Sequence, residues 1–137
     1  MPKLTLAAAS LLAALALGAA TAAPLTGAEL QARASGGEFR GYGATRRNPL
    51  EDVILRFRPD GTVSSLSTIF RKAGGGMGTG QFEQYSDGGS WRVEGGRLCV
   101  QLGSVHGDLS GCYGVDGGAG NHVVLAGPVQ LRGTLGR

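Results

Sequence analysis

The chain has 137 residues, of which 13 are basic and 10 are acidic, so its formal net charge is only +3. This small excess excludes the strongly basic surface that is typical of nucleic-acid-binding domains. The length fits one domain with one core, and the 26 glycines are scattered between short apolar segments, as expected for many tight turns.

Residues 1–22 have the pattern of a secretory signal peptide. Lys3 precedes an alanine-rich apolar run, and Ala20-Thr21-Ala22 fits the small-residue cleavage site. An uncleaved membrane anchor is the alternative. Residues 23–137 then form a single β domain with no stretch apolar enough to span a bilayer. We therefore expect an exported protein, periplasmic or extracellular, in a compartment where a disulfide persists.

A short helix is predicted over about residues 27–34. Thr26 fits an N-cap that accepts a hydrogen bond from the Glu29 amide, while the Glu29 carboxylate reaches back to the Thr26 amide. Leu25 and Leu30 occupy the positions of a hydrophobic staple around this cap.

The rest of the chain alternates between apolar and polar residues and predicts strands joined by short turns. Pro59-Asp60-Gly61 and Asp87-Gly88-Gly89 are predicted turns. The apolar residues change parity between Val63 and Leu66, which predicts a bulge near Ser64-Ser65. The fold class is therefore all-β: a small up-and-down antiparallel barrel of about eight strands, with a two-sheet sandwich as the alternative.

The segment from Trp91 to Val115 predicts a hairpin closed by a disulfide between Cys99 and Cys112. With these two cysteines opposite each other, Leu98 faces Tyr113, and one side of the hairpin becomes entirely apolar. The apolar residues of that side are Leu98, Val100, Leu102, Leu109, Tyr113 and Val115. Two unpaired buried thiols are the alternative.

Three motifs together resemble a group of small exported bacterial proteins of unknown function that begin with a signal peptide. The motifs are an LTGxEL helix start at Leu25–Leu30, an FxPDGT turn at Phe57–Thr62, and a WxV, LC and CYxV pattern from Trp91 to Val115. The resemblance implies a β-barrel-like fold and no activity.

No pattern of residues indicates catalysis or a cofactor. His106 and His122 are expected to be solvated, and no cluster of ligands suggests a metal site. Glu51 and Asp52 point to opposite faces of a strand, which makes them a poor acid–base pair. The glycine loop at residues 73–80, expected to be mobile, lacks the helix of a phosphate-binding loop. We therefore predict a protein that is not an enzyme.

The sequence leaves several binding functions open. The first is a non-enzymatic exported domain that binds a small ligand or a cell-envelope component, with Trp91, Tyr113, Tyr42 and Phe57 as candidate core or pocket residues. An anionic envelope polymer could contact a basic patch made by Arg46, Arg47, Arg71, Lys72, Arg56 and Arg58. The alternatives are a protein-binding module or inhibitor that acts through the 73–80 glycine loop, and an enzyme without a recognisable motif.

Overall fold

A computed structural model describes residues 23–72 and 80–137, so the predicted signal peptide and most of the glycine loop, residues 73–79, lie outside the described residues. The chain is built mainly of strands, with one α-helix in the described part. The elements, in order, are β1 (Ala23–Pro24), α1 (Gly27–Ala34), β2 (Glu38–Gly43), β3 (Glu51–Phe57), β4 (Thr62–Lys72), β5 (Gly80–Glu94), β6 (Arg97–Leu102), the 3₁₀ turn η1 (Gly107–Leu109), β7 (Gly111–Gly117), β8 (His122–Ala126) and β9 (Gln130–Gly136).

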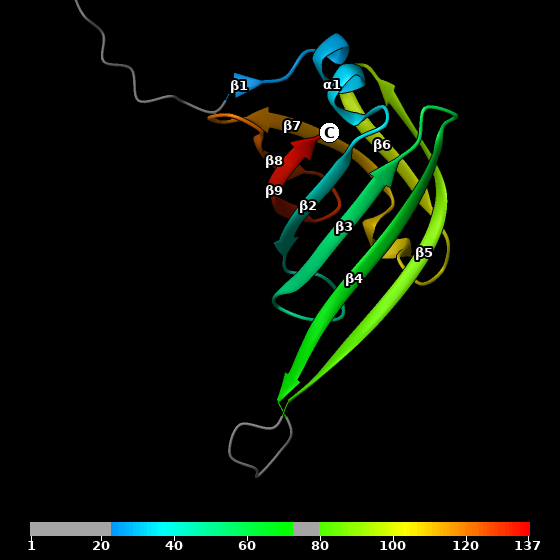
Figure 1. The fold of residues 1–137 in the computed structure, drawn as a ribbon, viewed down its shortest axis with the longest axis vertical. Helices are drawn as coiled ribbons and strands as arrows, with labels where there is room; N and C mark the ends of the chain where they lie inside the picture. The colour runs from blue at the N-terminus through cyan, green and yellow to red at the C-terminus, as the bar shows by residue number, and fades with distance from the viewer. Residues whose placement is uncertain (1–22, 73–79) are drawn as a thin grey trace, which may run out of the picture.

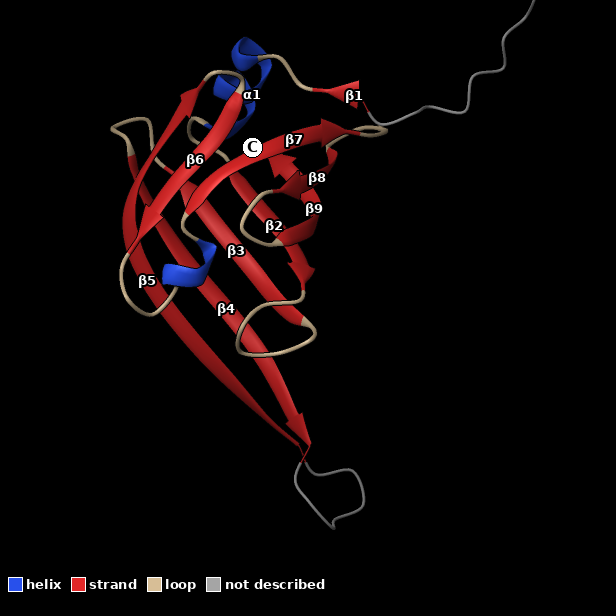
Figure 2. Cartoon of the chain, turned by 180° about the vertical axis from the view of Figure 1, so that it is seen from behind, coloured by secondary structure: helices blue, strands red, loops and turns tan. Residues whose placement is uncertain are grey.

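The strands close into an antiparallel barrel (Figures 1 and 2). Each strand from β2 to β9 pairs with the next one along the chain, and β9 pairs with β2 to complete the ring. The short strand β1 adds to the outside of the ring by pairing with β7. The predicted up-and-down barrel is therefore confirmed, because sequence order and spatial order coincide around the ring.

Apolar side chains that alternate along the strands fill the barrel. On β3, for example, Val53, Leu55 and Phe57 are at most 1 % exposed. The helix α1 lies at one end of the barrel, where Leu30 and Ala34 are fully buried (Figure 1). The Thr26 hydroxyl accepts a hydrogen bond from the Glu29 amide as predicted, but it also donates to the Glu29 carboxylate, so the predicted contact of that carboxylate with the Thr26 amide is replaced.

The predicted bulge in β4 is wrong. The pairing of β4 with β3 and β5 keeps a constant register throughout, without an extra residue. The inward positions after Val63 are Ser65 and Ser67, which are buried, and Leu66 points outward. The parity change in the sequence therefore marks two buried serines and not a kink in the strand.

The predicted turn at Asp87-Gly88-Gly89 is also wrong, because β5 runs through it without a break. A Cβ atom on Gly89 would collide with the backbone oxygen of Gln101 on β6. Glycine is therefore needed at this position because the two strands approach each other closely there, and not because the chain turns.

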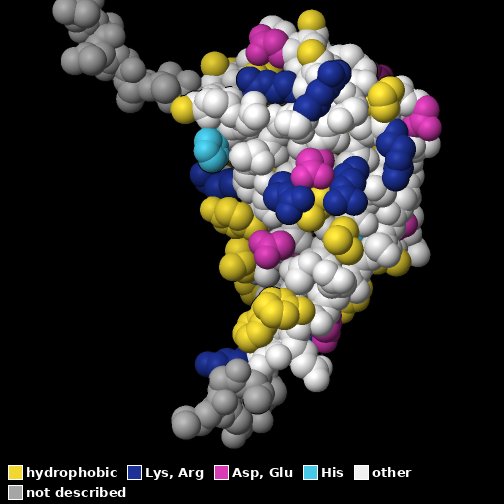
Figure 3. Space-filling view, viewed as in Figure 1, with side chains coloured by type: hydrophobic (Ala, Val, Ile, Leu, Met, Phe, Trp, Pro, Cys, Tyr) yellow, Lys and Arg dark blue, Asp and Glu magenta, His cyan; other side chains and the backbone are white. Residues whose placement is uncertain are grey.

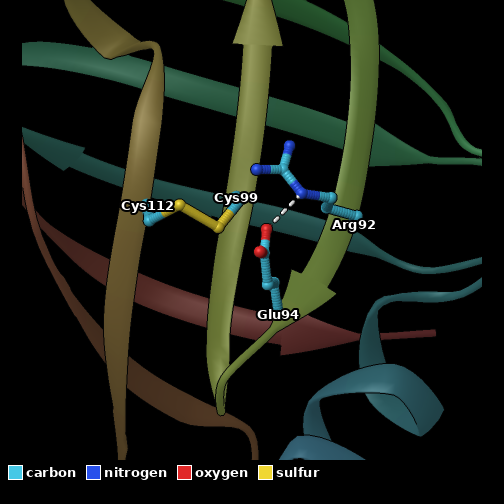
Figure 4. Close-up of a disulfide and its surroundings, with 4 residues drawn as sticks. All are labelled: Arg92, Glu94, Cys99 and Cys112. Carbon is cyan, nitrogen blue, oxygen red and sulfur yellow. Dashed lines mark hydrogen bonds and ion pairs between the residues drawn. A yellow bond between two sulfur atoms is a disulfide. The ribbon is translucent and has the colours of Figure 1, made fainter.

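The disulfide hairpin formed by β6 and β7 follows the predicted register at its centre. Leu98 pairs with Tyr113 and Cys99 with Cys112, and the two cysteines form a disulfide with a Cα–Cα distance of 4.0 Å. Figure 4 shows this bond on the outside of the barrel, beside the Arg92–Glu94 ion pair of β5. The ladder ends at Val100 and Gly111, and beyond it the Leu102 amide donates to the Ser110 hydroxyl at 2.9 Å.

Candidate functional site

The four predicted pocket residues separate into two groups. Trp91, Phe57 and Tyr113 belong to the core: Phe57 and Tyr113 are 1 % exposed, and the Trp91 ring meets Phe57 edge-on with centroids 5.4 Å apart. The buried Tyr113 hydroxyl donates to the Leu109 carbonyl at 2.6 Å, and burial raises the pKa of this phenol. Tyr42 is 48 % exposed and lies on the outside of β2.

Three hollows follow one another on the outside of the barrel, over β2, β9 and β8. The largest, about 460 Å³, is lined by Arg40, Arg56, Arg58 and Arg137, with Glu38 as its acidic residue. A second hollow of about 330 Å³ shares Thr134 with the first, and it is lined by Tyr42, Asp116, His122 and Arg132.

The third hollow, about 320 Å³, is lined by Pro49 and Leu50 and shares both Tyr42 and Arg132 with the second. Tyr42 and Arg132 are direct cross-strand partners on β2 and β9, so an exposed aromatic ring and a guanidinium group stand between these two hollows. We call the three connected hollows the outer track.

The charge of the outer track is predominantly positive. Glu38 forms ion pairs with both Arg40 (2.9 Å) and Arg56 (3.2 Å), and hydrogen bonds from Arg40 and then Arg56 lower the pKa of this carboxyl. One carboxylate is thus shared between two guanidinium groups, and Arg58 and Arg137 add further positive charge. Figure 3 shows the resulting cluster of basic side chains on the face formed by β2 and β3.

A second polar cluster, which the sequence did not predict, is buried inside the barrel near the end opposite α1. His106 is fully buried, so the expectation that it is solvated is wrong, whereas His122 is exposed. The His106 Nδ1 lies 2.5 Å from the Ser65 hydroxyl, and the His106 Nε2 lies 2.8 Å from the Ser67 hydroxyl. Burial lowers the pKa of His106, and the nearby Arg47 acts in the same direction.

Arg47 links this cluster to the two loops that close the same end. The Arg47 Nε lies 2.9 Å from the carboxylate of Glu51, which is fully buried. The Arg47 Nη1 lies 2.9 Å from the Asp108 carboxylate, and it also donates to the Val105 carbonyl at 2.8 Å. Burial raises the pKa of Glu51, but hydrogen bonds from Ser67, Thr45 and Arg47 outweigh burial and hold this pKa below its ordinary value. Loop 44–50 and loop 103–110 are therefore fastened to each other and to the barrel wall.

The position of Arg47 also corrects the predicted basic patch. Arg47 is paired with two carboxylates, and Arg71 pairs with Glu83 at 2.9 Å, so neither contributes an unbalanced charge there. Arg56 and Arg58, by contrast, line the outer track. The outer track thus takes Arg56 and Arg58 from the predicted patch and adds Arg40 and Arg137 to them.

The Ser67–His106 distance is one at which a histidine can activate a serine hydroxyl. Both residues are fully buried, however, so a substrate cannot reach them in this arrangement. Glu51 and Asp52 do face opposite sides of β3, as predicted, since Glu51 is buried and Asp52 is exposed. The buried position of His106, Ser65 and Ser67 therefore indicates a structural role for this cluster, which closes the end of the barrel. The recurrence of serine at inward positions 65 and 67 was the signal in the sequence that could have revealed it.

The fold and the outer track define a small, closed antiparallel β-barrel with a basic outer surface and a buried polar cluster. Compared with known proteins, the chain matches no family model, no curated protein and no solved structure. The resemblance to small exported proteins thus stays a prediction. Within the described part of the chain, no helix has both the length and the apolar character that crossing a membrane requires.

Proposed function

We propose that this protein is an exported, non-enzymatic barrel that binds an anionic cell-envelope component along the outer track. The observation that carries the proposal is a series of three hollows that share lining residues: four arginines line the first, and Arg132 and the exposed Tyr42 line the other two. An extended ligand with carboxylate or phosphate groups fits this arrangement, because guanidinium groups bind both in bidentate geometry. The disulfide supports export, since such bonds persist in oxidising compartments.

The core geometry favours the outside of the barrel over its interior as the binding surface. Trp91, Phe57 and Tyr113 pack against other core side chains, while Tyr42 is accessible from solvent. An exposed tyrosine beside a guanidinium group can stack on a sugar ring while the guanidinium group holds an acidic substituent. An acidic polysaccharide or a polyol phosphate is therefore the proposed class of ligand.

Retention of the folded, disulfide-bonded protein on immobilised polygalacturonate and on immobilised poly(glycerol phosphate) tests the proposal. We expect retention at low ionic strength that is lost as salt is added, because exposed charges are screened. The double substitution Arg58→Gln/Arg132→Gln should weaken binding by about tenfold or more, as charge-assisted hydrogen bonds are lost.

The matched control is Arg92→Gln/Arg97→Gln, which removes the same charge from β5 and β6, outside the outer track. Equal weakening by both double variants would show that net charge alone governs retention and would contradict the proposal. Absence of retention of the unaltered protein at low salt would contradict it too. Tyr42→Ala should weaken binding to the polygalacturonate more than binding to the polyol phosphate, which has no sugar ring in its backbone.

A second candidate function is a protein-binding module or inhibitor that acts through the 73–80 segment. The observation that favours it is a pair of exposed phenylalanines, Phe70 and Phe82, on the two strands that lead to this segment. Deletion of residues 73–79 separates the two functions: capture of a protein partner would be lost, and polymer binding would be retained.

A further inference from the structure

The hairpin formed by β4 and β5 extends well beyond the barrel (Figures 1 and 2). The pairing of β3 with β4 begins at Asp52 and Thr68, and the pairing of β6 with β5 begins at Leu102 and Gly89. Beyond these points the two strands pair only with each other among the described residues. Loop 103–110 reaches the β5 edge at Asp87, whose carboxylate accepts from the His106 amide at 2.9 Å.

The open edge of β5 therefore lies at Gly80–Gln84. The Trp91 amide donates to the Gly61 carbonyl at 2.9 Å, so odd-numbered residues of β5 direct their backbone groups toward β4. The β4–β5 register is constant over its whole length, and backbone direction alternates along a strand. Phe82 and Gln84 consequently direct their N–H and C=O groups away from β4, toward the open edge.

One face of this projecting hairpin carries an aromatic pair, and the other carries an ion pair. Phe70 and Phe82 are direct cross-strand partners with ring centroids 5.1 Å apart, and they are 52 % and 73 % exposed. The opposite face carries the Arg71–Glu83 ion pair, and the Tyr85 hydroxyl donates to the same carboxylate at 2.6 Å. An exposed aromatic pair at an open strand edge is a candidate contact surface for a partner.

The nature of the edge favours a polypeptide over a lipid surface as that partner. Unpaired backbone groups are costly in hydrocarbon, whereas an added strand satisfies them. Natural edges are usually protected by proline, by a bulge or by an inward-pointing charge. Residues 80–84 contain no proline and pair with β4 without a bulge, and their one charged residue, Glu83, is paired with Arg71, so this edge is only weakly protected.

Self-pairing of this edge has a favourable register centred on Phe82. Residues whose N–H and C=O groups point toward the open edge must face residues of the same kind in the second copy. An antiparallel pair centred on Phe82 meets this requirement and places the two copies of Phe82 opposite each other. Gly80 then faces Gln84, and Gln81 faces Glu83. A shift of the centre by one residue to position 83 would place Glu83 against Glu83, which is unfavourable because like charges repel.

We propose that the partner is a second copy of this chain, bound through antiparallel pairing of the two β5 edges about a two-fold axis at Phe82. The four strands of the two hairpins then form one continuous sheet. The aromatic rings of Phe70 and Phe82 from both copies form a row of four across one face of this sheet. The two Phe82 rings, one from each copy, lie side by side at the centre of this row and contact each other.

The experiment is sedimentation equilibrium of the folded, disulfide-bonded protein from about 5 µM to about 500 µM, a range that covers weak homodimers. We expect the average mass to rise toward that of a dimer. Gln84→Pro removes an outward N–H without breaking the β4–β5 ladder, because proline is tolerated at strand edges. It should weaken association by about tenfold or more, whereas its matched control Gln84→Ala should not. Phe82→Ser should also weaken association, and Trp91 fluorescence verifies that each variant is folded.

A cysteine trap checks the register. Phe82→Cys should form a disulfide-linked dimer under mild oxidation, whereas Arg92→Cys, on the part of β5 that pairs with β6, should not. The proposal is overturned if the protein stays monomeric at the highest concentration, or if a dimer forms that neither Gln84→Pro nor Phe82→Ser weakens. Absence of a link at position 82 overturns the register. If the Phe82→Cys variant instead links to a different polypeptide while the chain itself stays monomeric, a second copy is not the partner.

Discussion

Replacement of Arg47 by methionine tests the role of the buried polar cluster in closing the barrel end. Methionine keeps most of the length of the side chain but removes the contacts with Glu51 at 2.9 Å, Asp108 at 2.9 Å and the Val105 carbonyl at 2.8 Å. The Glu51 carboxylate is fully buried, so the substitution leaves a charge without its cation in a site that excludes water. Loss of one partner from a buried ion pair costs about 3–5 kcal/mol.

A loss of this size is a large fraction of the stability of a domain, which is typically about 5–15 kcal/mol. The free energy of unfolding should therefore fall by about 3 kcal/mol or more in urea titrations monitored by Trp91 fluorescence. The double variant Arg47→Met/Glu51→Gln removes the stranded charge, so it should be more stable than Arg47→Met alone. The coupling energy from this cycle should be about 2 kcal/mol.

The pH dependence of Arg47→Met provides a second test. In the unaltered protein the pKa of Glu51 lies below its ordinary value, so its contribution to stability is lost as pH falls through the region below about 4.5. Without Arg47 the burial of Glu51 should raise this pKa above the ordinary value, and protonation then stabilises the fold. The deficit of the variant relative to the unaltered protein should thus shrink as pH is lowered.

The matched control for this prediction is Arg92→Met. Arg92 pairs with Glu94 on the surface, where the two side chains are 62 % and 65 % exposed, and exposed pairs contribute at most about 1 kcal/mol. Similar losses of stability for Arg47→Met and Arg92→Met would refute the assignment of Arg47 to a buried, structurally required ion pair. A coupling energy near zero between positions 47 and 51 would refute it as well.

Two further predictions concern His106 and the disulfide. The pKa of His106 is lowered in the fold, so the unfolded chain takes up this proton first, and stability should decline as pH falls below about 6.5. His106→Gln should flatten this decline between about pH 7 and 5 in urea unfolding. Equal pH profiles for His106→Gln and the unaltered protein would contradict the assignment. Cys99→Ala/Cys112→Ala should lower the free energy of unfolding by about 3 kcal/mol, because the bond closes a short loop in the unfolded chain, and an unchanged urea midpoint would argue against that contribution.

Local patterns in the sequence were enough to predict much of the fold. The Thr26 cap and the alternation of Val53, Leu55 and Phe57 correctly placed α1 and β3, since both signals depend on neighbouring residues. The apolar face of the Cys99–Cys112 hairpin was also predicted, because a shift of one residue would have exposed it.

The errors arose where a residue has two physical roles. Gly89 was interpreted as part of a turn, yet it is needed because the Gln101 carbonyl passes close to it. Ser65 was interpreted as part of a bulge, yet it points inward and hydrogen-bonds His106. In both cases the deciding contact comes from a segment distant in the sequence, and alternation of residue types along one strand carries no information about it.

The sequence by itself determined that this chain forms antiparallel strands with a capped helix and a disulfide hairpin, since these features follow from local propensity, periodicity and turn chemistry. The tertiary structure alone decided which polar residues meet. Closure of the barrel brings His106 between Ser65 and Ser67, and it places Arg132 beside Tyr42 on the outer track. The physical reason is that pairing between β9 and β2 closes the ring and sets the neighbours of every strand, and this contact joins residues nearly one hundred positions apart.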